Sequence, residues 1–209
     1  MSKTVCIFPK DETTDFLVPL YELLCSKGVD GWHEDTVNNV TIVIDMIRGA
    51  EEIIFLGHGS SGTLYGSPVN GELSELITQN NVHELLAGKK CFLLSCNSEE
   101  FCLNYNLSDS IGFGNMPTGM RDVFMAMDND VSFPNLEQED IDVYNNALIR
   151  ALTRAFNTYS LDNIDSLYAK ICLYANFEIT ECLTRKTCQM YREVAELLQN
   201  LKNECRLYK

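Results

Sequence analysis

Two short apolar runs end in side chains that can carry out chemistry. They are Ile53-Ile54-Phe55-Leu56-Gly57-His58-Gly59 and Cys91-Phe92-Leu93-Leu94-Ser95-Cys96-Asn97-Ser98. Each apolar run is short and stops at glycine or small polar residues, which is typical of a parallel strand buried on both faces. The carboxyl ends of neighbouring parallel strands meet at one edge of a sheet, where open α/β proteins bind ligands. We therefore expect His58 and Cys96 to lie side by side at such an edge.

The segments around these runs alternate between strand and helix patterns. Residues 5–8 and 110–114 predict two further strands, and residues 63–73 predict a hairpin. Strands that alternate with helices over the first 115 residues predict an α/β fold with a mostly parallel central sheet. We expect helices over residues 15–24, 36–48, 82–87, 121–127, 140–159, 161–174 and 184–207.

Composition limits the classes of protein to which this chain can belong. It has 209 residues, with 16 Lys and Arg against 30 Asp and Glu, and a formal charge of −14. That length suits one domain, and the negative charge disfavours binding to nucleic acid or to an anionic membrane. No apolar stretch approaches the roughly 18 residues that a membrane span needs. The N-terminus lacks the pattern of a signal peptide, so we expect a cytoplasmic protein.

The nine cysteines predict reduced thiols. No Cys-x-x-Cys pair occurs, and the three histidines do not stand at zinc-finger spacings from the cysteines. A chain with no export signal keeps most thiols reduced, and many serve as small buried apolar residues. We therefore expect no metal site and no cofactor.

A thiol beside an imidazole is the minimum needed for nucleophilic acyl transfer. The thiolate is a good nucleophile, and the imidazole can move protons to and from the reacting groups. The joint pattern of the two runs resembles the caspase-like (clan CD) cysteine peptidases. In that clan one hydrophobic block precedes His-Gly, as in His58-Gly59, and a second precedes Ala/Ser-Cys, as in Ser95-Cys96.

Within this clan the chain is most similar to the bacterial CHAT proteases. Residues 64–66 and 71–74 resemble the hairpin that follows the CHAT His-Gly, and Ser95 stands where that subgroup has alanine. The resemblance covers roughly residues 3–175 and implies a three-layer sandwich with helices on both faces of the sheet. It predicts a peptidase domain over residues 1–175 and a helical extension over 176–209. Further similar segments are 92–98, 110–114, 146–159 and 161–175.

The resemblance also implies a role for each site residue. Cys96 would attack the scissile carbonyl, and His58 would protonate the leaving amine and activate water. The backbone N–H groups of Gly59 and Cys96 would bind the oxyanion. Leu94 stands where several clan members carry an aspartate that selects a basic residue. Substrate would lie as an extended strand beside the segment 113–118, with the binding residues Phe113, Gly114, Asn115 and Met116.

Regulation and one rival function follow from the same comparison. CHAT proteases often act in bacterial defence or programmed death, so we expect a protein or peptide substrate and an activating partner or upstream protease. The acidic segment 127–143 is the candidate cleavage or gating segment. The alternative is a catalytically silent caspase-like scaffold that acts by binding other proteins. An apolar stripe within 190–205 either packs on its own domain or forms a homodimer, and we favour the first.

Overall fold

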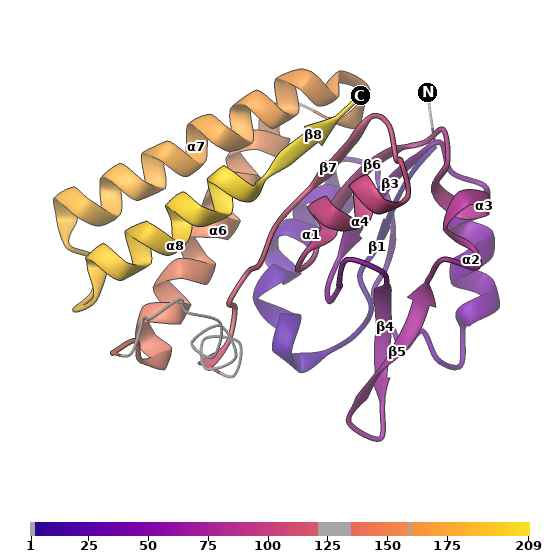
Figure 1. The fold of residues 1–209 in the computed structure, drawn as a ribbon, viewed down its shortest axis with the longest axis horizontal. Coiled ribbons are helices and arrows are strands. Elements are labelled where there is room, and N and C mark those ends of the chain that lie inside the picture. The colour runs from indigo at the N-terminus through magenta and orange to yellow at the C-terminus, as the bar shows by residue number, and fades with distance from the viewer. Residues whose placement is uncertain (1–2, 121–134, 159) are drawn as a thin grey trace.

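A six-stranded sheet organises the fold, and its strands run in the order β2-β1-β3-β6-β7-β8 (Figure 1). The computed structural model describes residues 3–120, 135–158 and 160–209. Neighbouring strands from β2 to β7 are parallel, and β8 pairs with β7 in the antiparallel direction. The prediction of an α/β fold with a mostly parallel sheet is confirmed. The strands of this sheet are β1 (Thr4–Ile7), β2 (Asp30–Trp32), β3 (Glu52–Leu56), β6 (Lys90–Leu94), β7 (Ser110–Gly112) and β8 (Arg206–Tyr208).

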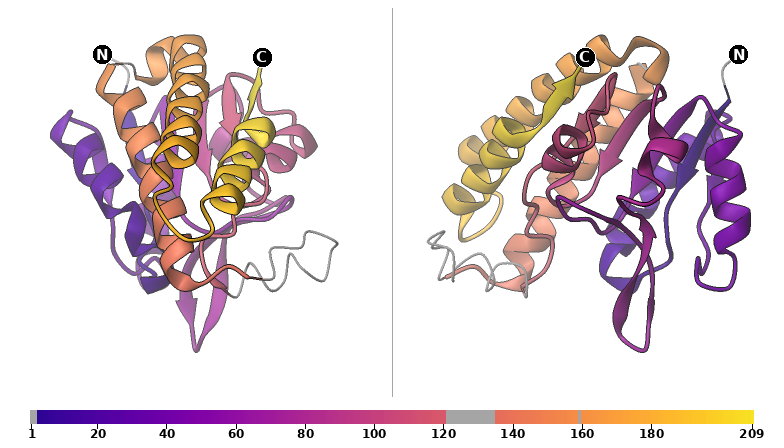
Figure 2. Two further views of the ribbon diagram at one scale, coloured as in Figure 1. Left: turned by 90° about the vertical axis from the view of Figure 1, so that its left-hand side faces the viewer. Right: turned by 45° about the vertical axis from the view of Figure 1, so that its right-hand side comes forward.

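Helices cover both faces of the sheet (Figure 2). One face packs against α1 (Val18–Ser26), α6 (Gln138–Thr158) and α7 (Ile164–Arg185). The other face packs against α2 (Val40–Arg48), α3 (Val82–Leu86) and α4 (Ser98–Asn104). The described residues also form two 3₁₀ helices, η1 (Glu12–Leu17) and η2 (Leu161–Asn163), the hairpin β4 (Leu64–Val69) with β5 (Glu72–Ile77), and α8 (Tyr191–Glu204).

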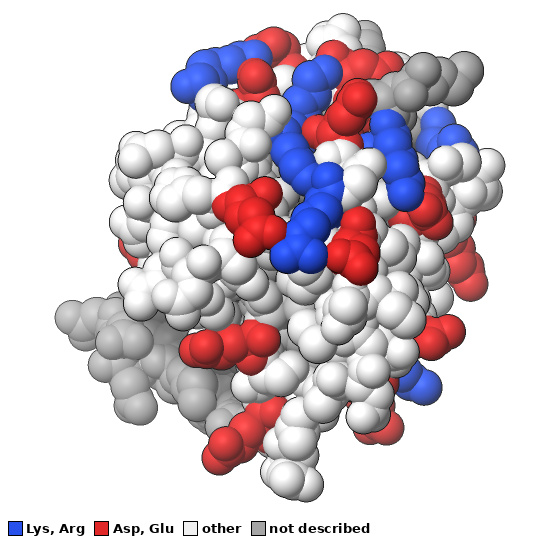
Figure 3. Space-filling model, turned by 90° about the vertical axis from the view of Figure 1, so that its right-hand side faces the viewer, with Lys and Arg blue, Asp and Glu red and all other residues white. Residues whose placement is uncertain are grey.

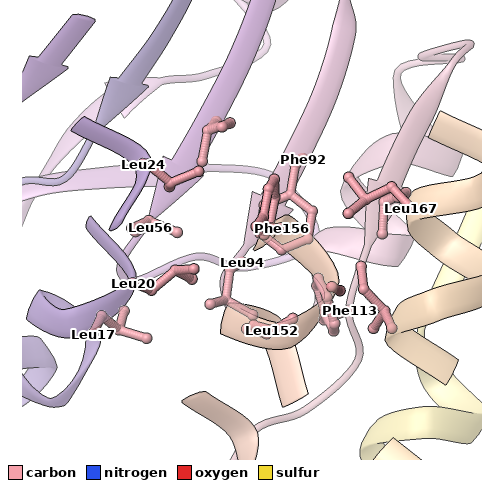
Figure 4. Packing of buried hydrophobic residues seen from close by; sticks show 14 of the residues in the cluster. Leu17, Leu20, Leu24, Leu56, Phe92, Leu94, Phe113, Leu152, Phe156 and Leu167 are labelled. Carbon is pink, nitrogen blue, oxygen red and sulfur yellow. The ribbon is translucent and has the colours of Figure 1, made fainter. Parts of the chain in front are cut away.

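Successive residues of the central strands point to opposite faces, as strand geometry requires. Leu56 and Leu94 join the cluster that α1 and α6 cover, and Figure 4 shows both among its side chains. Phe55 and the other alternate residues join the cluster under α2, α3 and α4. Because both faces are covered, every residue of β3 is buried. This is why the strand reads as a continuous apolar run.

Several predicted elements are confirmed, with shifted ends. The hairpin forms, and the helix expected over residues 82–87 is α3. The helix expected from residue 36 begins at Val40, because a turn precedes it in which the Val37 N–H donates to Asp35. The helix expected from residue 15 begins as η1 and becomes α1 at Val18. The expected helix over 121–127, and residues 127–134 of the acidic segment 127–143, lie outside the described residues.

The C-terminal part differs from the prediction. Helix α7 runs to Arg185 and not to residue 174, so the predicted boundary between residues 175 and 176 falls inside a helix. Helix α8 ends at Glu204, because Cys205 is extended and the next residues form β8 along β7. Val194, Leu197 and Leu201 are buried against neighbouring helices and the sheet. The apolar stripe therefore packs on its own domain, as favoured.

Positive and negative side chains are intermixed on the face of the molecule that Figure 3 shows. On that face Lys and Arg side chains lie among Asp and Glu side chains. Arg48 at the end of α2, for example, contacts both Asp45 and Glu84. None of the helices in the described part of the chain is both long and apolar enough to cross a membrane.

A buried carboxylate joins α6 to α7. Glu178 is 1% exposed, and its carboxylate accepts from Arg150 at 2.7 and 2.9 Å and from Arg154 at 3.0 Å. Both arginine side chains remain partly exposed, so the positive charges keep contact with water. The buried charge is therefore paired and fully hydrogen-bonded, which is the condition for burying it at low cost.

We expect Glu178→Gln to lower the free energy of unfolding by about 1–3 kcal/mol, because a neutral amide cannot replace these charge-assisted bonds. Urea denaturation measures the change. Glu181→Gln is the matched control, since Glu181 lies on the same helix and makes only an exposed pair with Arg185. That variant should lose no more than about 0.5 kcal/mol. Equal losses in the two variants would contradict a structural role for the buried carboxylate.

Candidate functional site

The register of β3 and β6 determines where the two predicted catalytic residues lie. Leu56 is paired with Leu94, and His58 and Cys96 each follow two residues later. The Gly57 N–H donates to the Leu94 carbonyl at 3.1 Å, which extends the ladder past the ends of the strands. Adjacent strands lie about 4.8 Å apart. Both side chains therefore leave neighbouring strands at the same edge, and both line one cavity.

This cavity is small. Its volume is about 20 Å³, which is room for roughly one water molecule. Apart from His58 and Cys96, none of the described side chains around it is ionisable, and most are apolar. Its lining comprises Thr14, Phe16, Leu17, Gly57, His58, Leu94, Cys96, Met116, Thr118 and Leu148.

Cys96 lies in the turn between β6 and α4. Its side chain is half-buried, and its Sγ donates to the carbonyl oxygen of Met116 at 3.4 Å. The turn needs a left-handed residue, and Asn97 supplies it with φ of 54°. The buried Ser98 hydroxyl bonds to the Leu93 and Ser95 carbonyls and accepts from the Phe113 N–H, so it holds both ends of the turn. The nucleophile candidate thus has a well-defined position.

His58 contacts two residues that the sequence analysis did not identify. Its Nε2 lies 2.7 Å from Thr13 Oγ1 and 3.2 Å from Asp11 Oδ2. Asp11 follows β1 and is the N-cap of η1, where its side chain accepts from the Thr13 N–H. An aspartate two residues before a threonine at a helix start is explained by capping alone. Sequence patterning therefore gives no reason to connect this aspartate with His58.

Gly59 lies against the cysteine turn. A Cβ at this position would fall 2.4 Å from Ser95 Oγ and 3.2 Å from the Cys96 carbonyl oxygen, so no side chain fits there. Gly59 lies opposite Leu64 in an isolated antiparallel bridge. The hydrogen bonds of this bridge are made by the neighbouring residues: the Tyr65 N–H donates to the His58 carbonyl, and the Ser60 N–H donates to the Thr63 carbonyl. In such a non-hydrogen-bonded pair the two residues direct their own amides away from each other. The backbone of Gly59 is thus brought beside Cys96.

The segment 113–118, which the sequence analysis predicts as the wall of the substrate site, runs past the same turn. The Phe113 side chain is fully buried and packs on Phe92 with ring centroids 5.4 Å apart (Figure 4). The Gly114 carbonyl accepts from Asn97 N–H. Asn115 is exposed, and its N–H donates to Glu204 Oε2 at 3.0 Å. Of the four predicted binding residues, Met116 lines the cavity.

The other thiols differ from Cys96 in their surroundings. All nine cysteines are thiols and none forms a disulfide within the chain. Burial raises the pKa of Cys91 to about 12, and it also raises the pKa of Cys6, Cys102 and Cys205. These thiols stay protonated at neutral pH and serve as apolar packing.

The other two histidines, His33 and His83, do not line this cavity. His33 Nδ1 lies 3.0 Å from the Phe8 carbonyl, and its ring stacks on Phe8. His83 is exposed on α3. Within residues 3–120, 135–158 and 160–209, no group of three or more His, Cys, Asp or Glu side chains is arranged to hold a metal ion.

Ser95, next to Cys96, has a buried hydroxyl that finds no hydrogen-bond partner among the described residues. An unpaired buried hydroxyl costs about 1–3 kcal/mol. We therefore expect Ser95→Ala to raise the free energy of unfolding by about 1 kcal/mol, measured by urea denaturation.

The control for this variant is Ser98→Ala, the same substitution at a serine that is equally buried and fully bonded. It should lower the free energy of unfolding by about 1–3 kcal/mol. If Ser95→Ala destabilised the protein as much as Ser98→Ala does, the Ser95 hydroxyl would have to be bonded in solution.

No protein-family model and no curated protein sequence matches this chain. Its chemistry is therefore inferred from the edge of the sheet itself. There, a half-buried thiol, an imidazole held by a carboxylate and a hydroxyl, and a glycine backbone lie together. These are the groups that acyl transfer requires.

Proposed function

We propose that this protein is a cysteine endopeptidase of the caspase-like type, with Cys96 as nucleophile and His58 as proton carrier. The observation that carries the proposal is the pairing of Leu56 with Leu94, which gives His58 and Cys96 equivalent positions at the ends of adjacent parallel strands. The cavity that both residues line supports the same assignment. A mostly parallel sheet with helices on both faces supports a caspase-like three-layer arrangement.

The reaction would proceed in two steps. First, His58 takes the thiol proton, and Cys96 Sγ forms a bond to the scissile carbonyl carbon. The resulting oxyanion accepts from the N–H groups of Gly59 and Cys96, and the C–N bond breaks as His58 gives its proton to the leaving amine. In the second step His58 takes a proton from water, which attacks the thioester. The carboxylic acid product leaves, and Cys96 regains its thiol.

The narrow cavity bears on regulation. A space of about 20 Å³ cannot hold an amino-acid side chain, and the Met116 carbonyl occupies the hydrogen-bonding position next to the thiol. A substrate side chain could enter this space only if part of its lining moved. This supports the proposal that a protein partner or an upstream protease activates the enzyme, as the resemblance to bacterial CHAT proteases implies. The same narrow cavity is the observation that favours the alternative, a catalytically silent scaffold.

Labelling with electrophilic peptides tests the proposal. Peptidyl acyloxymethyl ketones with varied terminal residues should add once to the wild-type protein, as detected by intact mass. Cys96→Ala should carry no adduct, and His58→Ala should react about 10²–10⁴ times more slowly, because the general base is missing. Cys25→Ala is the matched control, since Cys25 is also half-buried but lies on α1, outside the cavity. It should react like the wild type.

Two results would count against the enzyme. An adduct retained in Cys96→Ala would place the reactive thiol elsewhere. Absence of an adduct on the wild type and also on Met116→Ala, which widens the cavity, would favour the scaffold. An adduct on Met116→Ala alone would support an enzyme that must be opened before it acts.

A further inference from the structure

Asp11, Thr13 and His58 form a small hydrogen-bonded network at the edge of the sheet. Thr13 Oγ1 lies 2.8 Å from Asp11 Oδ1 and 2.7 Å from His58 Nε2. The second carboxylate oxygen, Asp11 Oδ2, lies 3.2 Å from the same Nε2. The Asp11 side chain is only 11% exposed, whereas Thr13 lies on the exposed side of the network.

Proton accounting in this network determines the tautomer of the histidine. An ionised carboxylate only accepts hydrogen bonds, and a threonine hydroxyl has one hydrogen to donate. The Thr13 hydroxyl donates to Asp11, so its oxygen must accept from His58. His58 Nε2 therefore carries a hydrogen, and the lone pair of the neutral ring lies on Nδ1. Asp11 Oδ2 is a second acceptor for the same N–H.

The two partners of the ring are held in place by their own local structure. The Thr13 N–H donates to Asp11 Oδ1 at 2.9 Å, which closes the cap of η1. The backbone carbonyl of Asp11 accepts from the Thr14 N–H and hydroxyl at 3.0 and 2.9 Å. The network therefore exists before any substrate arrives.

We propose that Asp11, acting directly and through Thr13, is a positioning residue that holds His58 as the Nε2–H tautomer with Nδ1 as the basic atom. This rests on the proposed function, in which His58 takes the proton of the Cys96 thiol; the tautomer makes Nδ1 the atom that receives it. When the ring gains that proton, the Asp11 carboxylate faces the positive charge on the imidazolium. Asp11 touches neither the substrate nor the reacting atoms, so it acts only through the histidine.

Asp11→Asn separates this role from helix capping. Asparagine caps helices about as well as aspartate, so the fold should be unchanged. Its amide, however, can donate to Nε2 and stabilise the opposite tautomer, with the hydrogen on Nδ1. In a serine protease the equivalent exchange lowers kcat by about 10⁴. We expect a loss of about 10²–10⁴ in the maximal rate of labelling at Cys96, with little change in the concentration that gives half of that rate.

Three further variants complete the set. Thr13→Val removes the bridging hydroxyl but leaves Asp11, so the maximal rate of labelling at Cys96 should fall by about one order of magnitude. Thr13→Ser keeps a hydroxyl at this position, so it should be labelled at the wild-type rate. Asp15→Asn makes the same substitution at an exposed position in η1 and should behave like the wild type. Thermal unfolding of each variant checks that the fold is intact.

Nitrogen NMR of the ring supplies a readout that does not depend on activity. Two-bond and three-bond proton–nitrogen correlations identify which ring nitrogen of His58 carries the hydrogen. We expect Nε2–H in the wild type and a shift toward Nδ1–H in Asp11→Asn. An unchanged tautomer and an unchanged labelling rate in Asp11→Asn would overturn the proposal. If neither the wild type nor Met116→Ala can be labelled at Cys96, the proposed function fails, while the tautomer still decides whether Asp11 orients the ring.

Discussion

The pairing of β3 with β6 is the constraint on which the rest of the structure depends. Both strands are buried on both faces, so a slip of one residue would turn every side chain toward the wrong layer. Packing of Leu56 and Leu94 into one core cluster therefore fixes the register. The same register gives His58 and Cys96 equivalent positions beyond the strand ends. Packing in the hydrophobic core thus determines where His58 and Cys96 lie relative to each other.

The strand β1, on the other side of β3, brings the Asp11 carboxylate to the same edge of the sheet. β1 lies beside β3 with Ile7 opposite Phe55, so the chain leaving β1 reaches the edge next to His58. Asp11 is held there as a helix cap, and its carboxylate serves the cap and the imidazole at once. The same carboxylate therefore has two roles. Its Oδ1 accepts from the Thr13 N–H at the start of η1, and its Oδ2 lies 3.2 Å from His58 Nε2.

The sequence predicts strongly patterned elements and misses those that depend on tertiary pairing. β3 and β6 are continuous apolar runs, and the two candidate catalytic residues follow from where those runs stop. β2 and β8 have three residues each and no apolar run, so only their neighbours define them. Past residue 174, α7 pairs Glu178 with arginines of α6, a tertiary contact that the local sequence pattern does not indicate. Asp11 was missed because its local capping role accounts fully for its presence.

The C-terminal segment, outside the family resemblance, is joined to the wall of the site. β8 pairs with β7, and Glu204 at the end of α8 accepts from the Asn115 N–H. The same carboxylate packs so closely on Gly114 that no Cβ fits there. Met116, whose carbonyl meets the Cys96 thiol, follows directly along the chain. Because the wall is bonded to the end of α8, any displacement of α8 also acts on the segment that closes the cavity beside Cys96.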